Sequence, residues 1–415
     1  MIPQRNHLAS LQVAALLLAS TSLLRVSAEN PVIVDLAENF AYADSFNNSP
    51  GATAVNELAA SIPILRSVLV LEHGKIVAEY SRADVDASIP YPVYSTTKSW
   101  MSLLFGLMIE NGLVSLDETL GDIFGNDPDV WNTVPNATQR QAIALEQMLT
   151  MTAGFSDSLP SNDTEVDFGN GGNLGGASLV DSLSNPQFDA DSVGSFQYLA
   201  ANNILSYVVQ ERANATPGDY LAQEVLPYLG MDSADFAWWQ NEDRVEYASF
   251  GMLLTSQQMA KWGQLYLQEG RSNNTHQLID EKWVHDSTSV QAGVDFYGYL
   301  IWVWTGVLIG MPTIDRVYCS MGLGGQDVCV SPQMERVFVQ QRDLSNEASP
   351  NPVVSLGIIS AVLDPETVFT NDINKPLASD LVEADDSPGI ASRGTTTFSI
   401  FFLLALVFSF VQTYC

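Results

Sequence analysis

The sequence has 415 residues and a formal net charge of −31, from 48 acidic and 17 basic residues. This length is enough for one large catalytic domain or two smaller ones. The acidic excess argues against a nucleic-acid ligand, because phosphate binding requires a basic surface. A large net charge of this kind is typical of a protein whose solubility depends on charge.

The first 28 residues have the features of a signal peptide. They contain Arg5, an apolar stretch over residues 8–24 and small residues at 26–28, where a signal peptidase cuts. An N-terminal membrane anchor is the alternative, which Ser and Thr within the short apolar stretch disfavour. The sequence therefore predicts entry into the secretory pathway, followed by an N-terminal extension at residues 29–60.

Potential glycosylation sites fit a secreted protein. Asn-x-Ser/Thr triplets begin at Asn47, Asn136, Asn162, Asn214 and Asn273. Such triplets also arise by chance, so each is weak evidence alone. Together with a signal peptide they predict a glycosylated surface.

The main domain is predicted at residues 60–365. Strand patterns occur at both of its ends, in residues 66–72, 75–80, 298–307, 316–319, 327–330 and 336–341. Helical patterns, including one at residues 197–213, and loops fill the middle, with a mostly helical insertion at about 115–255. Because strands and helices do not alternate, a doubly wound parallel sheet is disfavoured. We expect an α+β fold of α/β/α-sandwich type: an antiparallel sheet formed from both chain ends and flanked by helices.

The C-terminal part predicts attachment to a membrane. Residues 366–397 are acidic and rich in Pro, Gly, Ser and Thr, as in a linker. Residues 398–415 are uncharged and apolar, and no Lys or Arg follows them. This pattern favours a GPI-attachment signal over a single C-terminal transmembrane helix, which remains the alternative. We therefore expect an extracellular or cell-surface protein.

Cleavage of such a tail would remove Cys415 and leave two cysteines. Cys319 and Cys329 are ten residues apart, a spacing that suits two adjacent strands. In an oxidising compartment they are candidates for a disulfide. Two buried free thiols are the alternative.

Ser95 and Lys98 are the candidate catalytic pair. They precede a helical pattern that runs to Glu110, and a spacing of three residues places them on one helix face. A serine hydroxyl needs a neighbouring base, and burial favours the neutral form of lysine that acts as one. The same spacing also fits a helix-capping serine followed by an exposed lysine.

The segment with Ser95 and Lys98 is the first of six whose order along the chain is informative. They are YSTTKS at residues 94–99, GLVSLD at 112–117, LEQMLTMTAGF at 145–155, PYLGM at 227–231, MAKWG at 259–263 and GLGGQ at 322–326. Over about residues 60–345 the chain resembles the serine β-lactamase-like hydrolases, a family with penicillin-binding proteins, class C β-lactamases and 6-aminohexanoate-oligomer hydrolases. The resemblance implies that Ser95 is the nucleophile and Lys98 its base.

The resemblance also implies roles for two further motifs. Tyr198 would share protons with Lys98 and pass one to the leaving group, although an aromatic residue packed in the core is the alternative. Ala200 stands where the family has an Asn that helps to bind substrate amides. Ser320 stands where the family has the Lys that recognises a penicillin carboxylate. These two departures disfavour a β-lactam substrate.

The last glycine-rich segment would border the site. By resemblance the substrate-binding residues are Ser320, Gly322, Gly324 and Gly325. The backbone N–H groups of Ser95 and Leu323 would form the oxyanion hole. A simple tight turn is the alternative interpretation of the glycines.

The sequence thus predicts a hydrolase of small-molecule esters or amides that acts through a Ser95 acyl-enzyme without a metal or cofactor. No metal-binding motif is present, and His73, His276 and His285 are interpreted as ordinary loop or surface residues. A D-peptidase or β-lactamase on the same scaffold is one alternative. A catalytically inactive surface protein that binds ligands is the other, because a fold does not guarantee a function.

Overall fold

The computed structural model describes residues 31–46, 56, 59–60, 62–125, 128–156, 178–184, 186–198, 203–291, 293–305 and 316–344. The predicted signal peptide, linker, C-terminal anchor signal, Asn47 and Asn162 lie outside these residues. Within the described ranges, no helix is both long and apolar enough to span a bilayer.

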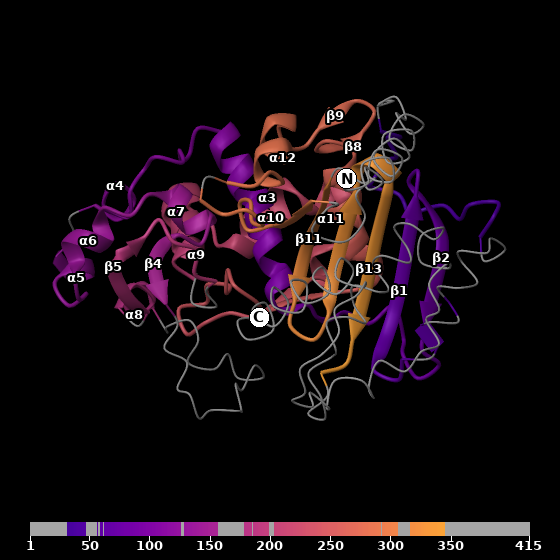
Figure 1. The fold of residues 1–415 in the computed structure, drawn as a ribbon, viewed down its shortest axis with the longest axis horizontal. Helices are drawn as coiled ribbons and strands as arrows, with labels where there is room; N and C mark the ends of the chain where they lie inside the picture. Colours follow the sequence, from indigo (N-terminus) through magenta and orange to yellow (C-terminus); the bar gives the residue numbers. More distant parts are fainter. Residues whose placement is uncertain are drawn as a thin grey trace, which may run out of the picture.

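A six-stranded antiparallel sheet forms one side of the molecule (Figure 1). Its strands lie in the order β10-β11-β12-β13-β1-β2. Their bounds are β1 Leu65–Glu72, β2 Lys75–Ser81, β10 Trp302–Thr305, β11 Arg316–Gly322, β12 Gln326–Ser331 and β13 Arg336–Arg342. Strands from the two ends of the domain meet where β1 pairs with β13, as at Leu69 and Val339. This antiparallel sheet and its flanking helices confirm the predicted α+β fold class.

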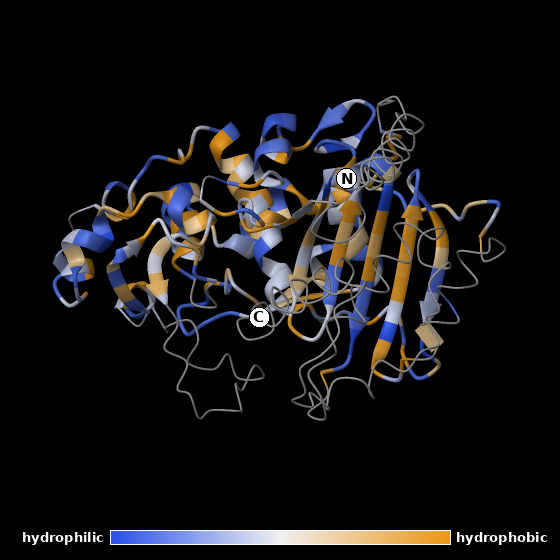
Figure 2. Cartoon of the chain, in the orientation of Figure 1, coloured by the Kyte–Doolittle hydropathy of each residue, from blue (hydrophilic) through white to orange (hydrophobic). Residues whose placement is uncertain are grey.

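Residues on both faces of the central strands are buried. In β1 only Arg66 and Glu72 are not buried, and Figure 2 shows apolar residues along most of this strand. Helix α11, Ser256–Leu267, packs on the sheet. A Cβ at Gly263 of this helix would lie 2.5 Å from Val337, so glycine permits the close approach of helix and sheet.

The remaining helices and small sheets lie beside the large sheet (Figure 1). The helices are α3 Thr97–Glu110, α4 Leu120–Phe124, α5 Pro128–Trp131, α6 Ala137–Gln141, α7 Leu145–Leu149, α8 Leu179–Ser184, α9 Ile204–Ala213, α10 Pro217–Glu224 and α12 Glu281–Ser287, with 3-10 turns η1 Tyr94–Thr96, η3 Leu226–Leu229, η4 Ser233–Asp235 and η5 Pro332–Met334. The small sheets pair β4 Ala153–Ser156 with β5 Gln187–Val193, and β8 Arg271–Asn273 with β9 His276–Gln277. A third places β7 Met252–Leu254 between β3 Tyr91–Pro92 and β6 Ala237–Trp238.

Helix α3 is the central element, since every residue from Thr97 to Met108 is buried. Figure 1 shows it between the large sheet and the other helices. A helix that is buried all round supplies a rigid support for residues at its N-terminus. The residues before and within its first turn include Ser95 and Lys98.

Two elements begin later than the sequence predicts. The strand expected from residue 298 begins at Trp302, because Leu300 adopts a left-handed conformation, with φ 61°, in the preceding turn. The helix expected from residue 197 begins at Ile204. The Gln197 N–H donates instead to the Met151 carbonyl oxygen at 2.8 Å, which holds this segment against the preceding loop.

Candidate active site

Ser95 lies in the short turn η1 that leads into α3. Tyr94, just before it, has φ 48°, a left-handed conformation that is unusual for a tyrosine. The Val93 N–H donates to the Met252 carbonyl oxygen at 3.0 Å and anchors the entry to the turn. Ser95 itself is 9% exposed, whereas Thr96 is fully buried. The serine is therefore held on a sharp bend, with a small part of its surface accessible to solvent.

The Lys98 amine lies directly beside the serine hydroxyl. Lys98 Nζ is 3.1 Å from Ser95 Oγ, and the lysine residue is only 2% exposed. The amine also donates to the Ser249 carbonyl oxygen at 2.8 Å. Burial disfavours the charged form of an amine. The pair has the distance and surroundings that a nucleophile and its base require.

Tyr198 lies beside the Lys98 amine. The centre of its ring is 4.9 Å from Lys98 Nζ. The ring stacks on Trp302, the first residue of β10, at 5.2 Å between centres, and Tyr198 is 5% exposed. The structure thus brings Tyr198 together with Ser95 and Lys98, which lie about 100 residues earlier in the chain.

Strands β11 and β12 hold the serine turn through two hydrogen bonds. The Ser320 hydroxyl donates to the Thr96 carbonyl oxygen at 3.1 Å, and Thr96 Oγ1 donates to the Gln326 carbonyl oxygen at 2.5 Å. Ser320 is fully buried. Its hydroxyl therefore joins the strand to the turn that carries Ser95.

The glycines after Ser320 allow close backbone contacts. A Cβ at Gly322 would lie 2.1 Å from the Val93 carbonyl oxygen, so only glycine fits at this point. Gly324 and Gly325 have φ values of 79° and 90°, and the Gly325 N–H donates to the Gly322 carbonyl oxygen at 3.0 Å. These bonds form a tight turn with the half-buried Leu323 at its first bend.

A disulfide links the same two strands. Cys319 on β11 and Cys329 on β12 are directly opposite each other and form a disulfide with a Cα–Cα distance of 4.2 Å. Both residues are buried. The cross-link lies next to Ser320 and joins the two strands that hold the serine turn.

Sequence reasoning missed two residues of the site. Ser249 belongs to no recognisable motif, and it contributes a backbone carbonyl, which every residue has. Asn203 lies at the start of α9, where its Oδ1 accepts from the Ser249 N–H at 3.2 Å. Only the arrangement in space identifies them.

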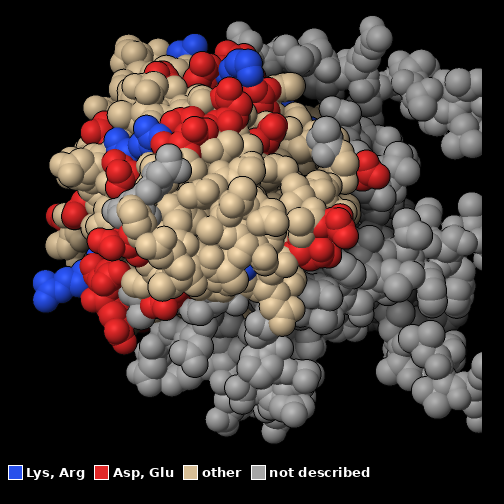
Figure 3. Space-filling model, turned by 90° about the vertical axis from the view of Figure 1, so that its left-hand side faces the viewer, with Lys and Arg blue, Asp and Glu red and all other residues tan. Residues whose placement is uncertain are grey.

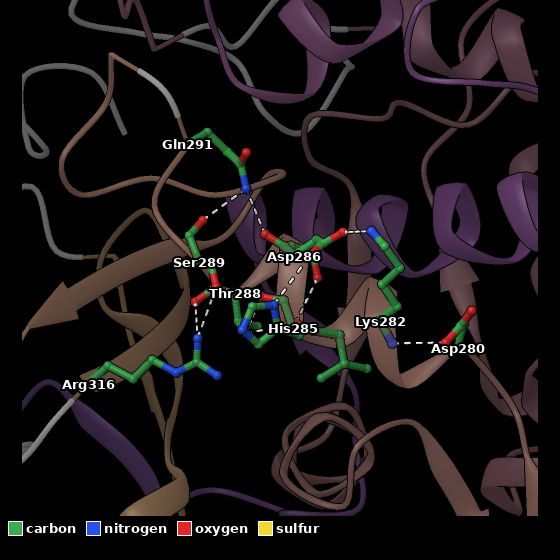
Figure 4. Close-up of polar contacts among 10 residues, drawn as sticks. Asp280, Lys282, His285, Asp286, Thr288, Ser289, Gln291 and Arg316 are labelled. Atoms are coloured by element: carbon green, nitrogen blue, oxygen red, sulfur yellow. Dashed lines mark hydrogen bonds and ion pairs between the residues drawn. The ribbon is translucent and has the colours of Figure 1, made fainter.

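The histidines show no comparable geometry. In Figure 4, His285 lies beside Asp286 near the end of α12, with Nδ1 3.2 Å from Oδ1. The nearby Ser289 hydroxyl donates to the His285 backbone carbonyl oxygen rather than to the ring, and it accepts from Arg316. These contacts close the helix end and tether β11. They do not form a Ser-His-Asp triad.

Among the described residues, the other two histidines have partners of their own. His73 pairs with Glu335 at 2.9 Å, and the His276 ring stacks on Tyr228. No group of three His, Cys, Asp or Glu residues in the described part of the chain has the arrangement to hold a metal ion.

Figure 3 shows that acidic side chains outnumber basic ones on the face at the helical end of the molecule.

The comparisons with known proteins agree with this geometry. The model of the family described as Beta-lactamase matches residues 62–354. The chain therefore belongs to the beta-lactamase family, a family of serine hydrolases, and the resemblance seen in the sequence is confirmed. No curated protein matches the sequence.

Similar solved structures include enzymes of several kinds. A protein described as a 6-aminohexanoate-dimer hydrolase from Bacillus anthracis has a TM-score of 0.60 and 18% identity, and the match covers 83% of this chain and 93% of that one. EstCE1, a hydrolase with promiscuous acyltransferase activity, has a TM-score of 0.58 and 16% identity, over 75% and 97%. A D-stereospecific amidohydrolase from Streptomyces sp. has a TM-score of 0.57 and 13% identity, over 76% and 98%. At these identities the likeness shows the shared fold alone.

Proposed function

We propose that this protein hydrolyses ester or amide bonds of small molecules through an acyl-enzyme on Ser95. The observation that carries the proposal is the 3.1 Å contact between Lys98 Nζ and Ser95 Oγ. The amine is buried and donates to the neutral Ser249 carbonyl oxygen. A neutral amine in this position has a lone pair to accept the serine proton.

The reaction has two steps. Lys98 takes the Ser95 proton as the serine oxygen attacks the substrate carbonyl carbon, and the proton then passes to the leaving alcohol or amine as the acyl-enzyme forms. Water attacks this ester next, and the same amine takes a proton from the water and returns it to the Ser95 oxygen as the carboxylic acid leaves. Tyr198, whose ring lies 4.9 Å from the amine, is assigned to proton sharing with Lys98.

The oxyanion of each tetrahedral intermediate needs two donors. We assign them to the backbone N–H groups of Ser95 and Leu323. The hydrogen bonds that join Thr96 to Ser320 and Gln326 support this assignment, because they hold the serine turn against the hairpin that carries Leu323. Donors fixed before the reaction cost no reorganisation as charge develops.

The strand beside the site favours simple esters and amides over β-lactams. Ser320 replaces a lysine at this position, and its hydroxyl is occupied by the Thr96 carbonyl oxygen. No cation is therefore supplied here for the carboxylate of a penicillin. Ala200, which lies outside the described residues, likewise replaces an amide side chain.

A fluorophosphonate probe tests the proposal. Intact mass spectrometry of the whole protein should show one adduct, peptide mapping should place it on Ser95, and Ser95→Ala should abolish it. Hydrolysis of p-nitrophenyl esters and anilides of graded acyl length would then be compared with hydrolysis of nitrocefin. Nitrocefin turnover that matches ester turnover would favour a β-lactamase, and absence of the Ser95 adduct would favour an inactive binding protein.

We also propose that the protein is secreted and attached to the cell surface by its C-terminal tail. The disulfide supports an oxidising compartment. Asn136 and Asn214 are exposed and Asn273 is half-buried, which leaves the first two open to glycosylation. Peptide-N-glycosidase should lower the mass of the expressed protein, and a phosphatidylinositol-specific phospholipase should release it from membranes. Retention on the membrane after that treatment would favour a transmembrane helix.

A further inference from the structure

The contact between Lys98 and Ser249 raises the question of what fixes the Ser249 peptide. Its carbonyl oxygen accepts from Lys98 Nζ at 2.8 Å, and its N–H donates to Asn203 Oδ1 at 3.2 Å. Ser249 is fully buried and Asn203 is 2% exposed. One backbone residue therefore lies between the asparagine side chain and the proposed base.

The Asn203 side chain is poorly explained by packing alone. Its amide nitrogen has no hydrogen-bond partner within the described residues, although the residue is buried. Burial of an unpartnered amide nitrogen is costly, and an acceptor for the Ser249 N–H does not by itself need that nitrogen. A group kept at such a cost next to a reactive centre is a candidate for a role there.

We propose that Asn203 is a positioning residue for Lys98: it fixes the Ser249 peptide, whose carbonyl oxygen directs the amine toward Ser95. This inference rests on the proposed function of the Ser95 and Lys98 pair. A neutral amine has two hydrogens and one lone pair. When the Ser249 carbonyl oxygen accepts one hydrogen, the rotation of the amine is restricted and its lone pair can stay directed at the serine hydroxyl.

The choice of an amide also has an electrostatic reason. Asn203 supplies an acceptor for the Ser249 N–H without a negative charge. A carboxylate in the same place would accept the same hydrogen bond but would favour the charged ammonium form of Lys98. An ammonium ion has no lone pair with which to take the serine proton.

Two substitutions separate the two parts of this role. Asn203→Asp keeps the size, the acceptor and a residue favourable at a helix start, but it adds a charge. Labelling of Ser95 by the fluorophosphonate probe should then need a pH about one unit higher, and labelling at pH 7 should fall about tenfold. Asn203→Leu removes the acceptor, so labelling should slow by about 10- to 100-fold at every pH with the same midpoint.

Asn241 offers a matched control in the same region. Its Oδ1 accepts from the Val245 N–H at 3.0 Å, as Asn203 accepts from Ser249, but its amide nitrogen donates to the Tyr207 hydroxyl. Asn241→Asp should leave the pH profile of labelling at the wild-type position. An equal shift in this control would overturn the inference, because the effect would then not depend on the Ser249 peptide.

A second measurement reports on the amine without catalysis. The chain has five lysines, so NMR titration of protein labelled with 13C at the lysine ε-carbon gives few signals, and Lys98→Met assigns the relevant one. The Lys98 signal should titrate at higher pH in Asn203→Asp than in the wild type. Unchanged titration and labelling would overturn the inference while the proposed function stands. Absence of labelling in the wild type would instead defeat the proposed function, and an unshifted Lys98 titration in Asn203→Asp would still overturn the inference.

Discussion

The Ser320 hydroxyl donates a hydrogen bond to the Thr96 carbonyl oxygen at 3.1 Å, so that strand β11 holds the turn that carries Ser95. Both residues are fully buried. A buried carbonyl oxygen that loses its partner carries an uncompensated desolvation cost. The contact therefore links the stability of the domain to the position of the nucleophile.

Ser320→Ala should weaken both properties. The unpartnered Thr96 carbonyl oxygen should lower the free energy of unfolding by about 1–2 kcal/mol. A small displacement of the turn should reduce the rate of Ser95 labelling by about 10- to 100-fold. Urea unfolding and labelling kinetics measure the two effects.

Ser88→Ala is the control, at an exposed serine whose hydroxyl donates to Asp86. It should change neither the unfolding free energy nor the labelling rate. A Ser320→Ala protein with wild-type labelling would show that the bond is dispensable for positioning.

Gly322→Ala should separate the strand from the serine turn. The new Cβ would lie 2.1 Å from the Val93 carbonyl oxygen, and this contact can be relieved only if the backbone moves. We expect a loss of about 1–3 kcal/mol in unfolding free energy and a loss of labelling of about 100-fold.

Gly112→Ala is the control for the glycine change. Nothing lies within 4 Å of a Cβ there, although φ is 66°. It should cost about 1–2 kcal/mol through backbone strain while labelling stays at the wild-type rate. If Gly322→Ala and Gly112→Ala are both labelled at the wild-type rate, the close approach at Gly322 is a packing feature without a catalytic consequence.

Replacement of the two lysines that are buried among the described residues should affect labelling and stability differently. Lys98→Met should reduce Ser95 labelling by about 10³-fold, by analogy with the loss of other activating bases. It should cost only about 1 kcal/mol of stability, because the Ser249 carbonyl oxygen loses its donor while methionine fills similar space and removes a buried amine. Thermal unfolding and labelling on the same samples measure both effects.

Lys261 provides the comparison, because its amine serves the fold. It donates to the Leu36 carbonyl oxygen at 2.7 Å and to that of Glu38, and so anchors the segment at residues 31–46. Lys261→Met should lower the unfolding free energy by about 2–3 kcal/mol with normal labelling. Near-normal labelling in Lys98→Met would contradict its role as the base.

Local sequence patterns predict the Ser95 and Lys98 relationship well. Both residues lie within about one helical turn, so their separation follows from helix geometry. Strand patterns likewise indicate which residues form β1 and β13. Their pairing follows once an antiparallel sheet must be completed from both chain ends.

Other parts of the site are not predictable in this way. Ser249 is 151 residues from Lys98 and contributes only its backbone carbonyl oxygen, which every residue has, so its side-chain type does not indicate the contact. The start of α9 at Ile204, rather than near residue 197, depends on the contact of Gln197 with Met151. The family resemblance predicts that Ser320 binds substrate. Its hydrogen bond to Thr96 joins segments 224 residues apart, so it is seen only in the folded structure.

Asp327 should make stability depend on pH. It lies on β12, is 1% exposed, and accepts a hydrogen bond from Gln340 at 2.6 Å. Burial raises the pKa of Asp327 to about 6 from its ordinary value of 3.8, although Gln340 and the Arg342 charge favour the ionised form. Because the folded state holds this proton more tightly than the unfolded state, the stability that Asp327 contributes is complete below about pH 4. It is lost as the pH rises to about 6.

Comparison with Asp327→Asn isolates this contribution. From pH 4 to pH 6.5 the wild type should lose up to about 3 kcal/mol of unfolding free energy relative to the variant, since each unit of pKa difference is worth about 1.4 kcal/mol. Asp84→Asn should give the opposite slope, mainly below about pH 4, because hydrogen bonding to Arg82 lowers the pKa of Asp84. Urea unfolding of the three proteins at half-unit steps from about pH 2.5 to about pH 6.5 measures both slopes. A constant difference between wild type and Asp327→Asn would mean that the carboxyl group titrates alike in the folded and unfolded chains, so that its burial would carry no net cost.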